Sequence, residues 1–407
     1  MKSSWWLLAL VLGAVIPAAA GDWPQWRGPD RDGISRETGW RSDWGAEDRP
    51  KILWEAKVGI GFSSFAVSEG RVFTLGNDSD TDTLWCFEAA TGKVLWAHHY
   101  PMPLDALYFE GGPVSTPVVE GGRVFAIGKR GLVHCLNAAD GSVVWSTQIA
   151  EGEGGSRMPT WGFSGSPVVQ GDRVLINAGA FGLALQKADG SVLWRSEGAS
   201  EAGYSSPLPA VIEGAAVAIF SNTKAWVAAD PATGQEKWRH RWLTRYGVNA
   251  ADPIIQGQEM FISSGYDKGA ALLKISASGA EVVWQNKEMR NMMNPCLLID
   301  GKLYGIDGNE GDGAGLKCLD WKTGAALWKD DRVGAGTVIG ASGGEKLIVL
   351  TEKGELLFAP ADPSGFKPGR GFSILSGKCW TVPVLSDARL FARNAEGRVV
   401  CVDLSLP

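Results

Sequence analysis

Several groups of residues have types and spacings that could support chemistry. Asp78, Asp80 and Asp82 stand at alternate positions, as the ligands of a calcium-binding loop do. An EF-hand loop would need Gly where Thr83 stands and Glu where Ala89 stands, so the pattern favours a polar turn. The four histidines fit no zinc-ligand spacing, and the sequence contains no nucleophile elbow, phosphate-binding loop, CxxC or CxxCH motif. The sequence therefore predicts no metal site, and the fold would have to assemble any binding site.

The six cysteines are a second group that could react. Three of them lie six residues before the Gly of a phrase that recurs along the chain, and alanine holds that place in two other copies: Cys86, Cys135 and Cys318 against Ala184 and Ala228. A position that accepts Cys or Ala requires a small apolar side chain, which predicts buried thiols rather than a disulfide framework. Cys296 and Cys379 fall elsewhere in the repeat, and a disulfide between them stays open.

Composition restricts the classes of protein that need consideration. The chain has 407 residues, of which 45% are hydrophobic and 21% charged, and its formal net charge is −6. These values are ordinary for a globular protein with a large core. The sequence has no long run of Lys or Arg, so it lacks the positive surface that nucleic acid or anionic lipid would require. We expect no nucleic-acid partner.

The N-terminus has the pattern of a secretory signal peptide. Lys2 precedes the apolar stretch WWLLALVLGAVI, which ends at Ile16, and the small residues Ala18 to Ala20 follow Pro17. The stretch is too short to cross a membrane, and no other run reaches the roughly 18 residues that a span needs. The first cysteine is Cys86, so no cysteine is available for lipidation at the cleavage point. We predict a signal peptide over residues 1–20 and an exported chain, periplasmic or extracellular, that is soluble after cleavage.

Two phrases recur through the remainder of the chain. The first is FEAATGKVLW at residues 87–96, with relatives such as LNAADGSVVW and LDWKTGAALW. A β-rich run that ends at Thr-Gly or Asp-Gly and is followed by a second β-rich run indicates a hairpin. The second phrase, for example TPVVEGGRVFAIG from Thr116, precedes each copy of the first and is also typical of a hairpin. Together the two phrases predict a four-stranded antiparallel unit.

The units can be counted by the turn of their first hairpin. Eight markers recur at intervals of 43 to 51 residues: Gly70, Gly121, Gly171, Gly214, Gly257, Gly301, Gly344 and Asp387. A period of this length built from four strands is the signature of a β-propeller. We therefore predict an all-β fold, an eight-bladed β-propeller of four-stranded antiparallel blades. Residues 51–407 would form this single domain, and residues 21–50 would be an N-terminal extension.

The first and last units are incomplete in complementary ways. The last copy stops near Leu404 without a strand that carries Trp, whereas ILWEAKVG from Ile52 is such a strand with no copy before it. We expect the N-terminal strand around Trp54 to complete the eighth blade and close the ring. Seven Trp residues hold one equivalent place and are expected to pack between blades: Trp54, Trp96, Trp145, Trp194, Trp238, Trp284 and Trp328.

Antiparallel connectivity places the second turn of each blade and the segments between blades at one end of the ring, the top face. The two longest segments run from Trp96 to Pro117 and from Trp145 to Pro167. Long loops on a rigid ring are where binding residues concentrate, so we expect a protein or small-molecule ligand at the top face. The candidate residues are Asp105, Tyr108, Glu110, Glu151, Glu153, Arg157, Trp161, Tyr204, Arg245, Tyr246, Asn249, Asp252, Arg290, Asn294 and Trp380.

The repeated A-x-x-T-G-x-x-x-W phrase, together with DWPQWRGPDRDGIS from Asp22, resembles the pyrroloquinoline-quinone (PQQ) repeat family of the quinoprotein alcohol dehydrogenase-like superfamily. The resemblance covers residues 22 to 405 and implies the propeller fold. The enzymes of this superfamily hold PQQ on the propeller axis, between a Trp and, in many members, a disulfide of adjacent cysteines. Calcium and a catalytic Asp complete their site, whereas this sequence has no adjacent cysteines.

If PQQ were bound, the resemblance and the placement of residues on the top face suggest particular roles. Trp161 or Trp380 would stack on the quinone, and Arg157 would pair with its carboxylates. Asn249, Asn294 and Asp252 would be calcium ligands or, in the case of Asp252, the catalytic base.

The resemblance extends to the outer-membrane protein assembly lipoproteins of Gram-negative bacteria, propellers of the same repeat that act by binding proteins. Our prediction is an exported binding or interaction module, expected to be a monomer. The alternative is a PQQ- and calcium-dependent dehydrogenase of alcohols or sugars.

Overall fold

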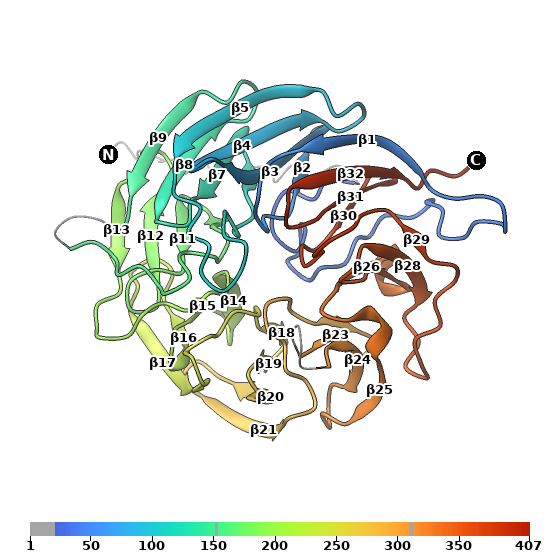
Figure 1. Cartoon of the computed structure of the whole chain (residues 1–407). Coiled ribbons are helices and arrows are strands. Elements are labelled where there is room, and N and C mark those ends of the chain that lie inside the picture. Colours follow the sequence, from blue (N-terminus) through green and yellow to red (C-terminus); the bar gives the residue numbers. More distant parts are fainter. Residues whose placement is uncertain (1–20, 151–153, 309–312) are drawn as a thin grey trace, which may run out of the picture.

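The computed structural model describes residues 21–150, 154–308 and 313–407. These residues form eight four-stranded antiparallel sheets arranged as the blades of a ring (Figure 1). The predicted fold class, an all-β eight-bladed propeller, is confirmed. The signal peptide predicted for residues 1–20 lies outside the described residues, as do Glu151 and Glu153. Within the described residues, no helix is long and apolar enough to cross a membrane.

In blades 1 to 4 the strands follow one another outward from the axis in chain order (Figure 1). Blade 1 contains β2 (Ala66–Ser68), β3 (Arg71–Asp78), β4 (Thr81–Glu88) and β5 (Val94–Pro101). Blade 2 contains β6 (Val118–Glu120), β7 (Arg123–Ile127), β8 (Leu132–Asn137) and β9 (Val143–Gln148). Blade 3 contains β10 (Val168–Gln170), β11 (Arg173–Ile176), β12 (Leu183–Gln186) and β13 (Val192–Arg195). Blade 4 contains β14 (Leu208–Ile212), β15 (Ala215–Ser221), β16 (Ala225–Ala229) and β17 (Glu236–Arg241).

The other four blades are built in the same way. Blade 5 contains β18 (Ile254–Gln256), β19 (Glu259–Ser264), β20 (Gly269–Ile275) and β21 (Ala280–Asn286). Blade 6 contains β22 (Leu297–Ile299), β23 (Lys302–Asp307), β24 (Gly315–Asp320) and β25 (Ala326–Asp330), followed by the short 3-10 helix η1 (Asp331–Val333). Blade 7 contains β26 (Thr337–Ala341), β27 (Lys346–Leu350), β28 (Glu355–Pro360) and β29 (Phe372–Ser373), with η2 (Ser342–Gly344) in its first turn. Blade 8 contains β30 (Val384–Ser386), β31 (Arg389–Arg393), β32 (Arg398–Asp403) and β1 (Lys51–Lys57).

The ring closes through blade 8, whose outer strand comes from the start of the chain. Strand β1 pairs with β32 in an antiparallel register that runs from Lys51 opposite Asp403 to Lys57 opposite Arg398. The prediction that the N-terminal strand completes the last blade is confirmed. Figure 1 shows β1 and β32 side by side, with the beginning and the end of the propeller in one sheet.

A fully buried arginine reinforces this closure. The guanidinium of Arg393, on β31, donates to the backbone carbonyls of Leu75 at 2.6 Å, Gly59 at 2.9 Å and Ser63 at 3.3 Å. These acceptors belong to blade 1 and to the segment between β1 and β2. Because buried polar groups are costly unless they are hydrogen-bonded, Arg393 and these carbonyls stabilise the joint between blades 8 and 1 together.

Each of the seven repeated Trp residues follows a β-bulge in the outer strand of its blade. In blade 1, Trp96 lies opposite Cys86 whereas Val94 lies opposite Phe87, so Leu95 is the extra residue. The same irregularity occurs before the other six Trp residues. A bulge bends the strand and increases its twist, which aims the indole at the neighbouring blade and discourages pairing of the exposed edge with another chain.

The indole rings dock the blades to one another by a common contact. Trp96 Nε1 donates to the carbonyl of Ala138 in the next blade at 3.0 Å, and its ring covers Gly141 of the repeated turn. A Cβ atom added at Gly141 would lie 2.7 Å from the indole. The other six Trp residues donate in the same way to the following blade, at 2.9 to 3.0 Å. The Gly of the repeated phrase therefore has two roles. It adopts the left-handed backbone conformation that the turn needs, and because it has no side chain it leaves a flat surface for the indole.

The joint between blades 7 and 8 is built differently because blade 7 lacks this Trp. Two residues of the N-terminal extension take its place: Trp44 contacts Phe372 with ring centroids 5.2 Å apart, and Trp40 packs on Phe358 at 5.9 Å. Trp40 is also bridged to Ser405 at the end of the chain. Residues 40–44 thus belong structurally to the propeller core.

All six cysteines are free and buried, as the repeat predicts. Cys296 and Cys379, for which the sequence left a disulfide open, are unpaired thiols. Burial raises the pKa of each of these two thiols to about 12, so neither is a reactive thiolate near neutral pH.

Candidate functional site

The N-terminal segment 22–36 runs through the middle of the ring. Trp23 exchanges two backbone hydrogen bonds with Val67 of β2, each 2.8 Å long. Further along the segment, Pro24 accepts from Val119 of β6, and Gly33 accepts from Gly340 of β26. These contacts reach the innermost strands of blades 1, 2 and 7. The segment, which we call the axial plug, therefore occupies the central channel.

The tip of the axial plug reaches the top of the channel. Trp26 Nε1 donates to Oδ2 of Asp252 at 2.7 Å, and the Arg27 guanidinium donates to the carbonyl of Cys296 at 2.9 Å. Asp252 lies two residues before the inner strand of blade 5, and Cys296 lies one residue before that of blade 6. The plug thus spans the depth of the ring and turns back at its glycines. Gly33, with φ of +77°, leaves no room for a side chain against Leu297.

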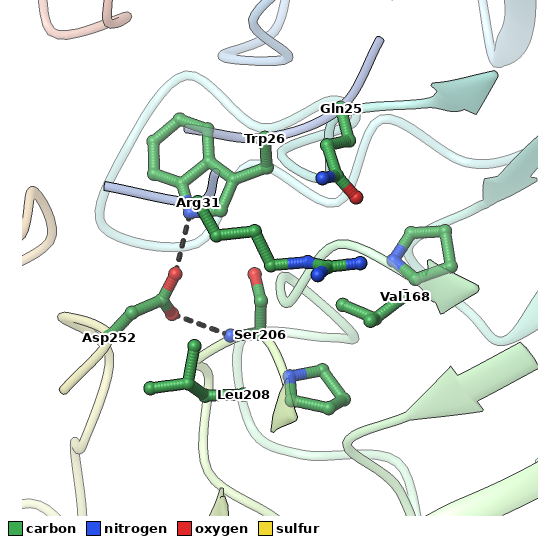
Figure 2. Close-up of a pocket in the computed structure, with 9 residues that line it drawn as sticks. Gln25, Trp26, Arg31, Val168, Ser206, Leu208 and Asp252 are labelled. Atoms are coloured by element: carbon green, nitrogen blue, oxygen red, sulfur yellow. Dashed lines mark hydrogen bonds between the residues drawn. The ribbon is translucent and has the colours of Figure 1, made fainter. Parts of the chain in front are cut away.

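A cavity of about 10 Å³ remains beside the plug, between Trp26, Arg31, Val168, Leu208 and Asp252 (Figure 2). A cavity of this size holds one water molecule at most. Figure 2 shows the Trp26 indole directed at Asp252 and the Arg31 side chain extending above Ser206 toward Val168. Burial raises the pKa of Asp252 to about 6, although Arg27 and the two hydrogen bonds to the carboxylate act in the opposite direction.

Asp252 is also the last member of a series of hydrogen bonds that runs along the top of the channel from blade 1 to blade 5. In successive blades, the backbone N–H of the residue two positions before the inner strand donates to a side-chain oxygen at the same place before the next blade. The sequence of contacts is Ser64 to Thr116 at 3.2 Å, Thr116 to Ser166 at 2.9 Å, Ser166 to Ser206 at 3.1 Å and Ser206 to Asp252 at 2.7 Å. These residues align in the repeat, so Asp252 takes the place that hydroxyl residues hold in blades 1 to 4.

The two asparagines that the sequence singles out have structural partners. Asn249 is fully buried; its Nδ2 donates to the carbonyls of Asn222 and Trp242, and its Oδ1 accepts from Ser264. Asn294 donates to the carbonyl of Trp380 at 3.2 Å, which brings two of the predicted residues together.

The residues predicted to stack on the quinone or to pair with its carboxylates lie in two parts of the top face. Trp380 lies in the segment between blades 7 and 8, where Lys378 Nζ is 4.1 Å from its ring centroid, and Phe62, in the segment before blade 1, is 5.9 Å away. Arg157 and Trp161 lie beside blade 4, where Arg157 pairs with Glu201 at 2.6 Å and Trp161 meets Tyr204 edge to face at 5.7 Å. The described residues therefore do not bring Trp161 and Trp380 into one side-chain cluster.

These contacts allow a test of whether PQQ and calcium would fit. The axial plug fills the channel, and the carboxylate of Asp252 and the amide of Asn249 are both bonded within the protein. Within residues 21–150, 154–308 and 313–407, no three His, Cys, Asp or Glu side chains converge as metal ligands would. The predicted residues, bonded in this way, do not form a site for the quinone and its metal.

The top-face loops instead expose apolar side chains. Tyr108 is 88% exposed and Tyr246 is 53% exposed, and both lie in segments between blades. Four other large apolar residues of such segments are exposed as well: Leu107, Met158, Leu243 and Met293. Exposed aromatic and aliphatic side chains on several loops of one face are typical of surfaces that bind proteins.

The first long loop is held firmly to the ring. Asp105 forms a two-point ion pair with Arg130, with N–O distances of 2.8 and 2.9 Å, and its carbonyl accepts from Lys129. Lys129 lies 4.7 Å from the ring centroid of Phe109 in the same loop. These anchors present Leu107 and Tyr108, between them, on a fixed support.

The acidic turn at Asp78, Asp80 and Asp82 comprises the end of β3, the connection that follows it and the start of β4. Its carboxylates are engaged separately: Asp80 accepts from the backbone of Leu104, and buried Asp82 accepts from Asn77 at 2.7 Å. The turn supports the first long loop, in agreement with the prediction of a polar turn.

Sequence reasoning missed the axial plug. It placed residues 21–50 outside the propeller, because this segment has neither the repeat nor an alternating pattern. Two signals could have located it: Asp252 aligns with a row of Ser and Thr in the repeat, and Trp40 and Trp44 supply the indole that blade 7 lacks.

The fold and the top face define a class of protein, an eight-bladed β-propeller of PQQ repeats. The family model described as "Outer membrane protein assembly factor BamB" matches residues 31–112 and 102–330, and the chain belongs to this family. The protein of that name from Shewanella oneidensis is 22% identical over 382 residues, which cover 87% of this chain and 89% of the relative. The Escherichia coli K12 protein is 37% identical over 87 residues, 21% of this chain and 22% of the relative.

Solved structures show the same fold. BamB from Moraxella catarrhalis superposes with a TM-score of 0.65 at 13% identity, covering 87% of this chain and all of that one. A europium-containing methanol dehydrogenase superposes with a TM-score of 0.69 at 11% identity, covering 91% of this chain and 89% of the other. Likeness at this level of identity concerns the fold alone.

Proposed function

We propose that this chain is an exported interaction module that binds a protein partner through its top face and takes part in the assembly of outer-membrane proteins. The single observation that supports this most strongly is the exposure of Leu107, Tyr108, Met158, Leu243, Tyr246 and Met293 on the loops between blades. A rigid ring that carries apolar side chains on anchored loops can bind a protein with little loss of conformational entropy. Family membership supplies the cellular process.

Export is part of this proposal. The Lys2-led apolar stretch and the small residues before Gly21 support delivery across the inner membrane. The mature chain would then act in the periplasm. Its relatives in this family carry the name outer membrane protein assembly factor, which is the process we propose for this chain.

The experiment compares two double variants in cells whose chromosomal gene has been deleted. L107S/Y108S removes an apolar pair from the top face. V192S/L193S removes an exposed apolar pair from the bulge of β13 on the outside of the ring. We expect the first variant to fail to restore outer-membrane protein levels and the second to restore them. Equal complementation by both variants, at equal protein levels, would contradict the proposal.

The dehydrogenase alternative predicts a different result. Purified protein incubated with PQQ and calcium, then freed of excess, would retain quinone absorption and oxidise an alcohol panel with a dye. We expect neither, because the plug and the internal bonds of Asp252 and Asn249 leave no room or free ligands. Stoichiometric quinone with turnover would overturn the binding-module proposal.

A further inference from the structure

A corner of the top face between blades 4 and 5 combines aromatic rings with positive charge. Lys224 lies in the turn between β15 and β16, and Arg241 ends β17. The segment that follows β17 and the turn between β19 and β20 complete this surface, which we call the blade 4–5 patch. Its residues are Lys224, Arg241, Trp242, Arg245, Tyr246, Tyr266 and Lys268.

The aromatic rings of the patch form a fixed base. Trp242 is buried and donates through Nε1 to Ser264 at 3.0 Å, and its backbone N–H donates to the carbonyl of Lys224 at 2.8 Å. Tyr246 meets Tyr266 edge to face with ring centroids 4.8 Å apart. The half-exposed ring of Tyr246 therefore packs against a neighbouring aromatic ring and keeps one part of its surface open to solvent.

The cations of the patch rest on these rings. Lys268 Nζ is 4.2 Å from the ring centroid of Trp242, and the Arg245 guanidinium carbon is 5.4 Å from that of Tyr246. Contacts of this kind hold a cation in place without neutralising it. Partial burial lowers the pKa of Lys268, and the positive charge of Arg241 lowers it further.

The positive charges of the patch are not neutralised by carboxylates that the structure describes. In the part of the chain that the structure describes, no carboxylate forms an ion pair with Lys224, Arg241, Arg245 or Lys268. The carboxylates beside the patch are already engaged, since Asp267 pairs with Lys287 at 2.6 Å and Glu201 pairs with Arg157 at 2.6 Å. Four cations that no described carboxylate neutralises are therefore concentrated on a protein whose net charge is −6.

We propose that the blade 4–5 patch binds an acidic polypeptide segment in which carboxylates alternate with apolar side chains. The carboxylates would pair with Arg241, Arg245 and Lys268, and an apolar side chain would pack on the exposed face of Tyr246. Arg and Tyr are the residue types that contribute most at protein interfaces, which favours a protein segment over a lipid surface. This inference rests on the proposed function and names the chemistry of the partner.

The test uses a fluorescein-labelled ten-residue peptide in which Glu or Asp alternates with Phe or Leu, titrated with the purified mature chain. We expect the triple variant R241Q/R245Q/K268Q to bind at least about tenfold more weakly, as loss of three exposed charge contacts would give. The control is K51Q/K57Q/K93Q, which neutralises three lysines on the opposite side of the ring, in blades 8 and 1, that form no ion pair with any residue the structure describes. The control should bind the peptide like the wild type.

Two comparisons fix the chemistry of the ligand. Binding should weaken as NaCl is raised, and a peptide with Lys in place of each acidic residue should not bind. Equal binding by the triple variant and the wild type, or an equal loss in the control, would overturn the proposal. Tighter binding to anionic phospholipid vesicles than to the acidic peptide would also overturn it.

The result of this test can be distinguished from the result of the test of the proposed function. If the acidic peptide does not bind while L107S/Y108S still abolishes complementation, the patch assignment fails and the proposed function stands. If the peptide binds through the patch while L107S/Y108S complements fully, the patch assignment stands and the proposed function fails.

Discussion

The indole Nε1 of Trp26 donates a 2.7 Å hydrogen bond to Oδ2 of Asp252, although 226 positions separate the two residues in the chain. The other oxygen of the carboxylate accepts from the backbone of Ser206. This contact fastens the N-terminal segment to the middle of the propeller. The hydrogen bond also engages the carboxylate of Asp252, the residue that the family resemblance suggested as a catalytic base.

The first prediction concerns this bond. Trp26→Phe keeps an aromatic ring but removes the donor, which leaves a buried carboxylate oxygen without a partner. We expect a loss of about 1–3 kcal/mol in the free energy of unfolding. Trp161→Phe is the control, since its edge contact with Tyr204 survives the change. Urea titration measures both, and equal losses in the two variants would contradict the role of the bond.

A second prediction tests the docking of Trp rings on the repeated glycines. Gly121 and Gly141 both have positive φ, but a side chain at Gly121 would meet nothing within 4 Å, whereas one at Gly141 would lie 2.7 Å from Trp96. The two Ala variants share the backbone strain and differ in the clash. We expect Gly141→Ala to be more destabilising than Gly121→Ala by about 2 kcal/mol. Similar melting temperatures for the two variants would rule out the packing argument.

A third prediction concerns ring closure. Arg393→Met removes a buried guanidinium and leaves the carbonyls of Leu75 and Gly59 without this donor. The expected loss in the free energy of unfolding is about 3 kcal/mol or more. Arg398→Met in the neighbouring strand removes an exposed ion pair with Glu55 and should cost less than about 1 kcal/mol. Equal losses in the free energy of unfolding from the two substitutions would show that Arg393 does not stabilise the closure of the ring.

A fourth prediction concerns pH. Burial between blades 1 and 2, and to a lesser degree the neighbouring charge of His98, lower the pKa of His134 from 6.5 to about 4. In the unfolded chain His134 binds its proton near pH 6.5, and in the folded chain only near pH 4. Stability therefore falls as the pH falls through this window, by about 3 kcal/mol from this residue.

The chain has only four histidines, so their imidazole NMR signals can be titrated individually. We expect His134 to titrate last as the pH falls. His134→Gln should lack this part of the pH dependence when its free energy of unfolding is compared with that of the wild type at pH 4.5 and 7.5. A His134 pKa near 6.5 would contradict the burial argument.

The sequence predicted those parts of the fold that repeat. The Gly-to-Trp spacing recurs because each blade packs against its neighbour through the same local residues. The sequence therefore predicted the number of blades and the closure of the ring by the strand that contains Trp54. In blades 1, 3 and 5 the bulge before the Trp also has a sequence mark, a pair of adjacent apolar residues such as Val94 and Leu95, and the structure exposes both members of each pair. An alternating strand without a bulge would bury one of them.

The axial plug could not be predicted in the same way. Its partners, among them Asp252, Cys296 and Gly340, are distant in sequence and contribute mainly backbone atoms or a single carboxylate. For the same reason, placement on the top face alone did not distinguish Asn249 and Asp252, which are bonded inside the protein, from Tyr108 and Tyr246, which face solvent.

Contact between the top-face loops and a protein partner can be measured directly. The experiment is photo-crosslinking in the native cells, with benzoylphenylalanine in place of Tyr108, Tyr246 or, as the control on the outside of the ring, Leu193. We expect a discrete protein adduct from positions 108 and 246 and none from position 193. Absence of adducts at both top-face positions, or an adduct from position 193 alone, would contradict a binding role for the top face.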